Sequence, residues 1–243
     1  MKAIGVIPSR YQSTRFPGKP LANICGKPMI WWVYSRAEKA LSLDQVIVAT
    51  DDDRIASVCQ QYGMNYIMTS KNHSTPTSRI YEVSQKIKSE LYVFIGGDEP
   101  LIEPEAIDAV VTHAKKSKDA VTHAMVTIKT APEVVDFTNI KVVVGTDGYL
   151  LYTSRSPLPF PKGSLDFKYK KFVGIGAFTK DALRFYNDTP KSMLERVEEC
   201  DLIRFIDKFI KVKMVEVHCR NVSVDTPKDL AAVVSIIENG EIV

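Results

Sequence analysis

The sequence is poor in cysteine and histidine, and neither residue type is clustered. Its four cysteines, Cys25, Cys59, Cys200 and Cys219, lie far apart, without a CxxC pair and without a nearby histidine at metal-ligand spacing. A disulfide framework or a structural zinc site normally needs closely spaced ligands of these types. We therefore expect reduced thiols, without a disulfide framework or a structural zinc site.

Long apolar runs and blocks of basic residues are also missing. No apolar run approaches the roughly 20 residues that cross a bilayer, and a strand-like segment begins so early that no room is left for a signal peptide. The net charge is only +3, and no Lys/Arg block resembles a nucleic-acid-binding arm. We expect a cytoplasmic protein without a membrane or nucleic-acid partner.

The glycine-rich fingerprints of common nucleotide-binding folds are absent as well. The first apolar segment is followed by neither a Walker A sequence nor GxGxxG. Gly174-Ile175-Gly176 lies inside an apolar strand-like run, so it does not form a dinucleotide-binding turn. A nicotinamide-dependent oxidoreductase, the default function for an α/β chain, is therefore disfavoured, and failure to bind NAD would exclude it.

What is present is an alternation of strand-like and helix-like segments. Buried strands are expected at 3–7, 45–50, 65–69, 91–95, 120–129 and 210–217, and helices at 29–40, 55–62, 80–88 and 103–116. Further strands are expected at 139–145, 149–154 and 169–178, and further helices at 180–186 and 192–205. This order is typical of a mostly parallel α/β sheet that binds ligands at the carboxyl ends of its strands.

The loop after the first strand combines cations with hydroxyl groups. Gly18 lies beside a lysine there, and Pro17 and Pro20 stiffen the loop. The candidate phosphate-binding residues of this loop are Arg10, Ser13, Thr14, Arg15 and Lys19. Backbone N–H groups and a following helix also favour anions at such a place. The competing interpretation is an ordinary solvated basic loop.

Two aspartates after apolar segments are candidate metal ligands. Asp98 follows the 91–95 strand behind Gly96-Gly97, where a ligand can approach the backbone closely; the competing interpretation is a turn aspartate. Asp225 stands before Pro227 and Asp229, a spacing that by itself favours the N-cap of a helix over a metal site.

Several sequence blocks, spread from residue 4 to residue 230, resemble the cytidylyltransferases that activate 3-deoxy-manno-octulosonate (Kdo), an acid sugar of bacterial surface polysaccharides. The blocks are IPSRYQSTRFPGKPL, IVATDDDRI, GDEPLI, SRSPLPF and VDTPKDL. The resemblance implies a Rossmann-like, mostly parallel nucleotidyltransferase sheet flanked by helices, with a small projecting dimerisation sheet. It implies a single domain over 1–243, in which about residues 120–190 supply sugar-side and dimerisation elements.

The resemblance also implies a reaction and its residues: an anomeric hydroxyl attacks the α-phosphate of CTP, with Mg²⁺ as cofactor, in a homodimer. Catalysis is assigned to Arg10, Arg15, Lys19, Asp98 and Asp225, of which Asp98 and Asp225 hold the metal. Nucleotide binding is assigned to Arg10, Ser13, Thr14, Arg15, Lys19, His73, Thr75, Thr77 and Arg79. Sugar binding is assigned to Gly96, Arg155, Phe172, Glu198 and Asp201.

The chain departs from the family pattern mainly near the sugar. Gly96 replaces a glutamine, Phe172 a histidine, Gly176 a tyrosine and Asp201 a glutamate, and HSTPTSR at 73–79 replaces HQSGTER. These departures leave two alternatives to Kdo activation itself. One is the same chemistry on a modified Kdo or another ulosonic acid. The other is a catalytically silent nucleotide-binding homologue, against which the retained cations and aspartates argue.

Overall fold

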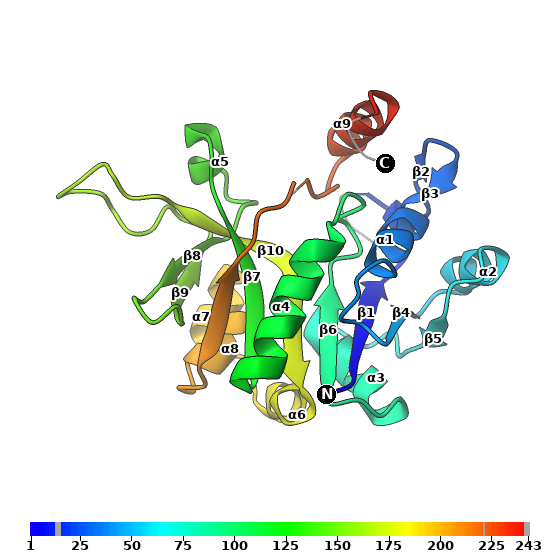
Figure 1. Ribbon diagram of the computed structural model, residues 1–243, viewed down its shortest axis with the longest axis horizontal. Helices are drawn as coiled ribbons and strands as arrows, with labels where there is room; N and C mark the ends of the chain where they lie inside the picture. The colour runs from blue at the N-terminus through cyan, green and yellow to red at the C-terminus, as the bar shows by residue number, and fades with distance from the viewer. Residues whose placement is uncertain (13–15, 221, 241–243) are drawn as a thin grey trace.

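The computed structural model describes residues 1–12, 16–220 and 222–240, and these build a nine-stranded mixed sheet (Figure 1). Seven strands follow one path in the order β11-β7-β10-β6-β1-β4-β5, and only β10 runs antiparallel to its neighbours. Their bounds are β1 Ala3–Ser9, β4 Gln45–Thr50, β5 Tyr66–Met68, β6 Leu91–Ile95, β7 Val121–Thr127, β10 Lys170–Thr179 and β11 Val212–Glu216. The expected mostly parallel α/β sheet is confirmed.

Helices cover both faces of this sheet. The apolar side chains of α1 (Met29–Ala37), α2 (Asp53–Gln61) and α4 (Pro104–Ser117) pack on one face. Those of α3 (Pro76–Lys86), α6 (Lys180–Asp188) and α8 (Leu202–Ile206) pack on the other. In α4, for example, Ile107, Val110, Val111 and Ala114 recur at helical spacing and are fully buried. No helix of the described residues is both long and apolar enough to cross a bilayer.

The sheet carries a small antiparallel extension. Strands β8 (Lys141–Val144) and β9 (Leu150–Ser154) form a hairpin that joins β10, with Gly148 in its turn at φ +76°. Beyond β9 the chain extends away from the body before it returns as β10 (Figure 1). A small antiparallel element at this place was expected, whereas its role in dimerisation remains a prediction.

The helix expected over 192–205 is two helices. It divides into α7 (Met193–Glu198) and α8, because Glu199 adopts a left-handed conformation with φ +50°. The break turns the chain between the two helices and places Cys200 and Asp201 at the start of α8. In a continuous helix, Cys200 and Asp201 would instead lie within the helix, between its two halves.

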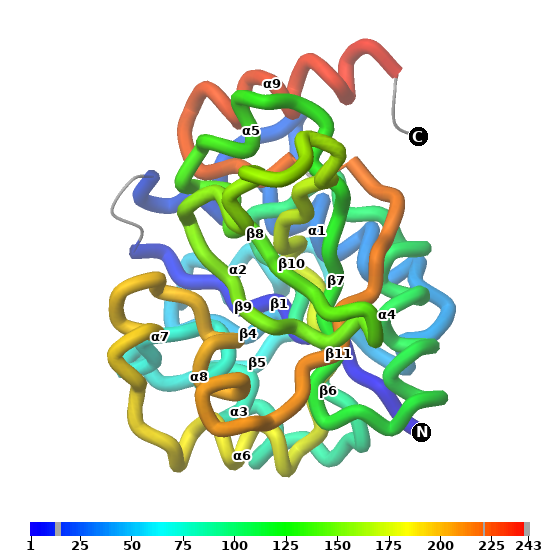
Figure 2. Tube along the Cα trace, turned by 90° about the vertical axis from the view of Figure 1, so that its left-hand side faces the viewer, coloured from blue at the N-terminus to red at the C-terminus, as the bar shows by residue number. Residues whose placement is uncertain are grey.

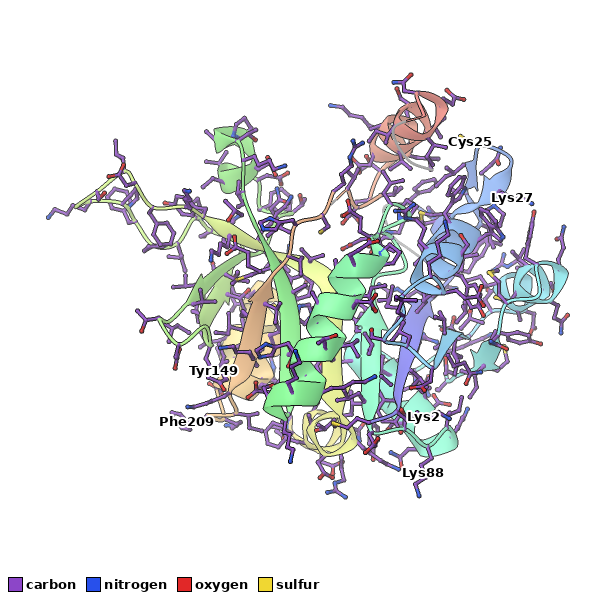
Figure 3. All side chains as sticks on the ribbon, viewed as in Figure 1. Lys2, Cys25, Lys27, Lys88, Tyr149 and Phe209 are labelled. Atoms are coloured by element: carbon purple, nitrogen blue, oxygen red, sulfur yellow. The ribbon has the colours of Figure 1, made fainter. Side chains whose placement is uncertain are left out.

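Short elements lie beyond the carboxyl ends of the parallel strands (Figure 1). They are a 3₁₀ turn, η1 (Lys19–Leu21), the β2–β3 hairpin (Asn23–Ile24 and Lys27–Pro28), α5 (Ala131–Val135) and the carboxyl-terminal helix α9 (Pro227–Glu238). A small separate core contains Ile24, Met29, Leu101, Val224 and Val233 and joins α9 to the hairpin. Figure 2 shows α5 and α9 at one end of the molecule and α6 at the other. In Figure 3, Cys25 and Lys27 mark the hairpin end and Lys2 and Lys88 the opposite end of the sheet.

Candidate functional site

Three segments that are far apart in the sequence meet at one ammonium group. The Nζ atom of Lys19 lies 3.2 Å from Oδ2 of Asp98 and 3.3 Å from Oδ1 of Asp225. It also donates a 2.8 Å hydrogen bond to the carbonyl oxygen of Val224. The two candidate metal ligands and one candidate phosphate-binding cation are therefore neighbours.

Local backbone features explain how these segments meet. Gly18, at φ +72°, precedes η1, and its N–H donates to the carbonyl of Tyr11 across the loop. Gly97 brings the end of β6 against β1, since a Cβ atom there would lie 2.9 Å from the carbonyl oxygen of Pro8. The N–H of Val224 donates to the carbonyl of Asp98, which fixes the carboxyl-terminal segment beside the β6 loop.

The cap of α9 clarifies the role of Asp225. Thr226 is the N-cap, and it forms a capping box with Asp229: the Thr226 hydroxyl accepts from the Asp229 N–H, and the Asp229 carboxylate accepts from the Thr226 N–H. The capping role that spacing alone favoured for Asp225 is therefore wrong. Because the neighbouring threonine caps the helix, the Asp225 carboxylate is turned toward Lys19.

The donor set around Lys19 fits a magnesium ion. Asp98 and Asp225 are hard oxygen donors that lie close enough to share one cation. Over residues 1–12, 16–220 and 222–240, no group of three or more His, Cys, Asp or Glu side chains is arranged to hold a metal by itself. Mg²⁺ typically takes one or two protein carboxylates and completes its shell with water and substrate phosphates, and this pair matches that number of carboxylates.

A polar cleft adjoins this cluster at the carboxyl ends of β1 and β4. It consists of two small cavities, of about 90 and 150 Å³, that share Arg10, His73 and Arg79. We call them together the Arg10 cleft. Ser9 lines it and also lies 3.3 Å from the position of a Cβ on Gly97, next to Asp98. Phosphate groups bound between Arg10 and Lys19 would thus bridge the cleft and the aspartate pair.

Two of the expected nucleotide-binding side chains hold the cleft together. The buried guanidinium of Arg79 donates to the Asp51 carboxylate at 2.8 Å and to the Thr69 hydroxyl. His73 contacts the Ser78 hydroxyl and the Glu82 carboxylate. Both side chains still line the cleft, but their polar ends are already paired, so they position its walls.

The start of α3 separates two further candidates. Thr75 is the N-cap of α3, and its hydroxyl accepts a hydrogen bond from the Ser78 N–H. Thr75 lines the Arg10 cleft. The Thr77 hydroxyl instead donates a 2.6 Å hydrogen bond to Oδ2 of Asp201, on the far side of Pro76. Thr77 therefore lies with an expected sugar-binding residue, and it does not line the cleft.

A third cavity, which we call the Asp201 pocket, has a volume of about 170 Å³. It lies between the starts of α3 and α8 and the strands β6, β7 and β10. Its lining residues are Pro76, Thr77, Phe94, His123, Ile140, Phe172, Phe178, Glu199, Cys200, Asp201 and Leu202. Two expected sugar-binding residues, Phe172 and Asp201, are thus brought together.

His123 is the residue of this pocket that sequence reasoning missed. Its ring stacks on Phe172 with centroids 4.2 Å apart. A Cβ atom on Gly176 would collide with the His123 ring, so the absent side chain at 176 makes room for the imidazole. The alternating pattern of its strand places His123 on one face of the sheet. The pattern does not indicate which residues of other elements pack against that face.

The other expected sugar-binding residues lie apart from the lining of the Asp201 pocket. The N–H of Gly96 donates to the carbonyl of Gly174, where β6 ends against β10. Glu198 accepts from the Ser154 hydroxyl and from the Arg155 N–H, and the Arg155 Nε donates to the Glu198 carbonyl. Arg155 and Glu198 therefore brace the end of β9 against α7.

Three candidates of the opening loop, Ser13, Thr14 and Arg15, lie outside the described residues.

Comparisons with known proteins cover nearly the whole chain. A family model described as Cytidylyltransferase matches residues 4–212. The 3-deoxy-manno-octulosonate cytidylyltransferase of Escherichia coli is 38% identical over 232 residues, which is 96% of this chain and 94% of that protein. The enzyme of the same name from Fusobacterium nucleatum subsp. nucleatum is 39% identical over 247 residues, 100% of this chain and 99% of that protein. A solved CMP:2-keto-3-deoxy-manno-octonic acid synthetase in complex with CTP is 37% identical with a TM-score of 0.94, over 99% of this chain and 100% of that chain.

Proposed function

The chain belongs to the cytidylyltransferase family, and we propose that it transfers the cytidylyl group of CTP to Kdo. The anomeric hydroxyl of the acid sugar attacks the α-phosphorus of CTP, which forms CMP-Kdo and releases pyrophosphate. The observation that carries this proposal is the meeting of Lys19, Asp98 and Asp225 beside the Arg10 cleft. Relatives named for this reaction match the chain over nearly its full length.

Charge and position are what this chain supplies to the reaction. Phosphoryl transfer depends mainly on alignment and on neutralising the charge that builds on the leaving group. We assign the positive charges of Arg10, Arg15 and Lys19 to the triphosphate. His73 and Thr75 line the same cleft, and we assign them to the base and ribose.

We assign Mg²⁺ to Asp98 and Asp225, with the triphosphate and water completing its shell. When bound, the ion supplies charge neutralisation and lowers the pKa of an oxygen ligand. Once the triphosphate binds, the ammonium of Lys19 can exchange its carboxylate contacts for phosphate oxygens. This exchange explains why a lysine occupies the space between two metal ligands.

A second candidate keeps the chemistry and changes the sugar. Gly96, Phe172, Gly176 and Asp201 depart from the family pattern, and two of them line the Asp201 pocket. A modified Kdo or another ulosonic acid therefore remains a candidate substrate. In either case we propose that the CMP-sugar serves bacterial surface polysaccharide synthesis, such as that of lipopolysaccharide, and that the reaction takes place in the cytoplasm, where CTP is available.

We also propose that the protein is a homodimer joined through the segment between β9 and β10. This segment carries Phe160 and Leu165, whose exposed fractions are 83% and 87%, beside the half-exposed Phe167. Large apolar side chains exposed together mark association surfaces. Light scattering should give a dimeric mass for the parent protein and a monomeric mass for the Phe160→Ser/Leu165→Ser double variant. A dimeric double variant would exclude this surface as the interface.

The test of function is magnesium-dependent pyrophosphate release with each nucleoside triphosphate in turn. The sugar panel contains Kdo, modified octulosonates, sialic-type acids and sugar phosphates. We expect release with CTP and an octulosonate. Asp98→Asn should abolish turnover and keep the fold, checked by circular dichroism. CTP binding without release from any sugar would favour the catalytically silent alternative.

A further inference from the structure

The Asp201 pocket is acidic and aromatic, and no lysine or arginine is among the described residues that line it. Carboxylates come from Asp201 and Glu199, and aromatic faces from Phe94, Phe172 and Phe178. The carboxylate that every ulosonic acid carries would meet only like charge in this pocket. The part of the sugar that enters must therefore be neutral or positively charged.

The polar atoms that the pocket offers are hydrogen-bond acceptors. The Thr77 hydroxyl already donates to Oδ2 of Asp201. The His123 Nδ1 lies 3.3 Å from the carbonyl oxygen of Ala124, and because a carbonyl only accepts, we assign the ring proton to Nδ1 and leave Nε2 an acceptor. A chemical group that binds in this pocket must therefore supply several hydrogen-bond donors.

The charge of Asp201 is only partly compensated. Burial raises the pKa of its carboxyl group, although the hydrogen bonds from Thr77 and Tyr186 act in the opposite direction. The Arg204 guanidinium is committed to Glu195, on which it forms a two-pronged ion pair. In the described parts of the chain, the Asp201 carboxylate has no salt bridge to a lysine or arginine.

The pocket is placed to receive a substituent of the sugar. Pro76 lines both this pocket and the Arg10 cleft, so the two spaces adjoin. Phe94 is on β6, and Gly96 is the first residue after that strand. Residues two positions apart in an extended chain lie on one face about 7 Å apart. A sugar with its anomeric hydroxyl at the cleft would extend its distal carbons past Gly96 toward Phe94 and Asp201.

We propose that the Asp201 pocket binds a positively charged amino substituent of the acid sugar, so that the preferred substrate is an amino-substituted octulosonate. Three donors of an ammonium group match the acceptors of Asp201 and His123, and the aromatic rings favour a cation at their faces. This inference rests on the proposed function, because it names the sugar class of the same site.

The experiment compares kcat/KM for pyrophosphate release from CTP with Kdo and with octulosonates in which one hydroxyl at a time is replaced by an amino group. A hydrogen-bonded charge pair predicts about a 10- to 100-fold preference for one amino sugar over Kdo. The N-acetylated form of that sugar, which keeps the nitrogen and loses the charge, should lose the preference.

Variants assign the preference to the pocket. Asp201→Asn and, separately, Phe172→Leu should lower the ratio of kcat/KM for the amino sugar to that for Kdo. Asp181→Asn, an exposed carboxylate on α6 outside the pocket, is the matched control and should keep the parental ratio. Because the parental protein alone reports the preference, the test stands even if one variant fails to fold.

The outcomes separate this inference from the proposed function. Faster release with Kdo than with every amino sugar would overturn the amino-sugar preference and leave Kdo activation standing. A preference that survives in Asp201→Asn would also overturn it, since the charge would be recognised elsewhere. Absence of release with Kdo and with every amino sugar would overturn both.

Discussion

Replacing Lys19 with methionine should move metal affinity and turnover in opposite directions. The ammonium lies 3.2 Å from one carboxylate and 3.3 Å from the other, but the side chains of Asp98 and Asp225 are 39% and 27% exposed. Solvent screening therefore limits each ion pair to about 0.5–1 kcal/mol. A metal ion that displaces Lys19 from both aspartates gives up about 1–2 kcal/mol, which corresponds to about 5- to 30-fold in the dissociation constant.

We expect the free Lys19→Met protein to bind Mg²⁺ about 5- to 30-fold more tightly than the parent, measured by isothermal titration calorimetry without nucleotide. Pyrophosphate release should fall by about 100-fold or more, because one preorganised charge at the leaving phosphates is lost. Lys39→Met, at an exposed lysine beyond α1, is the matched control and should keep both parental values. Unchanged or weaker Mg²⁺ binding in Lys19→Met would refute the competition, and near-parental turnover would refute the role of Lys19 at the phosphates.

Further predictions concern the helices and strands that build the Asp201 pocket. Arg204→Leu should lower the free energy of unfolding in urea by about 3–5 kcal/mol, because the buried Glu195 carboxylate loses its partner. Adding Glu195→Leu should restore part of that stability. Equal losses in the single and the double variant would contradict this reasoning. Gly176→Ala should cost about 1–3 kcal/mol, since its Cβ would press on His123, and a neutral effect would mean that the ring has room to move. Burial lowers the pKa of His123 to about 4, so the unfolded chain gains a proton before the folded one and stability falls as the pH is lowered from 6.5 toward 4. Between pH 7 and pH 5 the free energy of unfolding should fall by about 1–2 kcal/mol more in the parent than in His123→Gln. Equal decreases in the two proteins would exclude this cause.

The central features of the site followed from local sequence and parallel-sheet geometry. Arg10 comes directly after β1 and Asp98 follows β6 behind two glycines, and the carboxyl ends of parallel strands share one edge of a sheet. Lys19 was a candidate because of its loop. That it contacts both Asp98 and Asp225 could not be predicted from spacing, since the contact depends on how the carboxyl-terminal segment folds back over β6.

Other features were hidden because they depend on competition between neighbours. Spacing favoured Asp225 as the cap of α9, but the hydrogen bonds exchanged between Thr226 and Asp229 make Thr226 the cap. The break at Glu199 was hidden by helix-forming residues on both sides. The contact between Thr77 and Asp201 joins residues 124 positions apart, and no local pattern indicates such a pair.

The most direct test of the account is magnesium-dependent pyrophosphate release from CTP in the presence of Kdo, measured beside the same assay with ATP, GTP and UTP. The account predicts release that requires Mg²⁺, that is fastest with CTP, and that yields CMP-sugar in an amount equal to the pyrophosphate. Pyrophosphate release that needs no octulosonate, or that proceeds equally with the phosphate of a neutral sugar, would contradict the account.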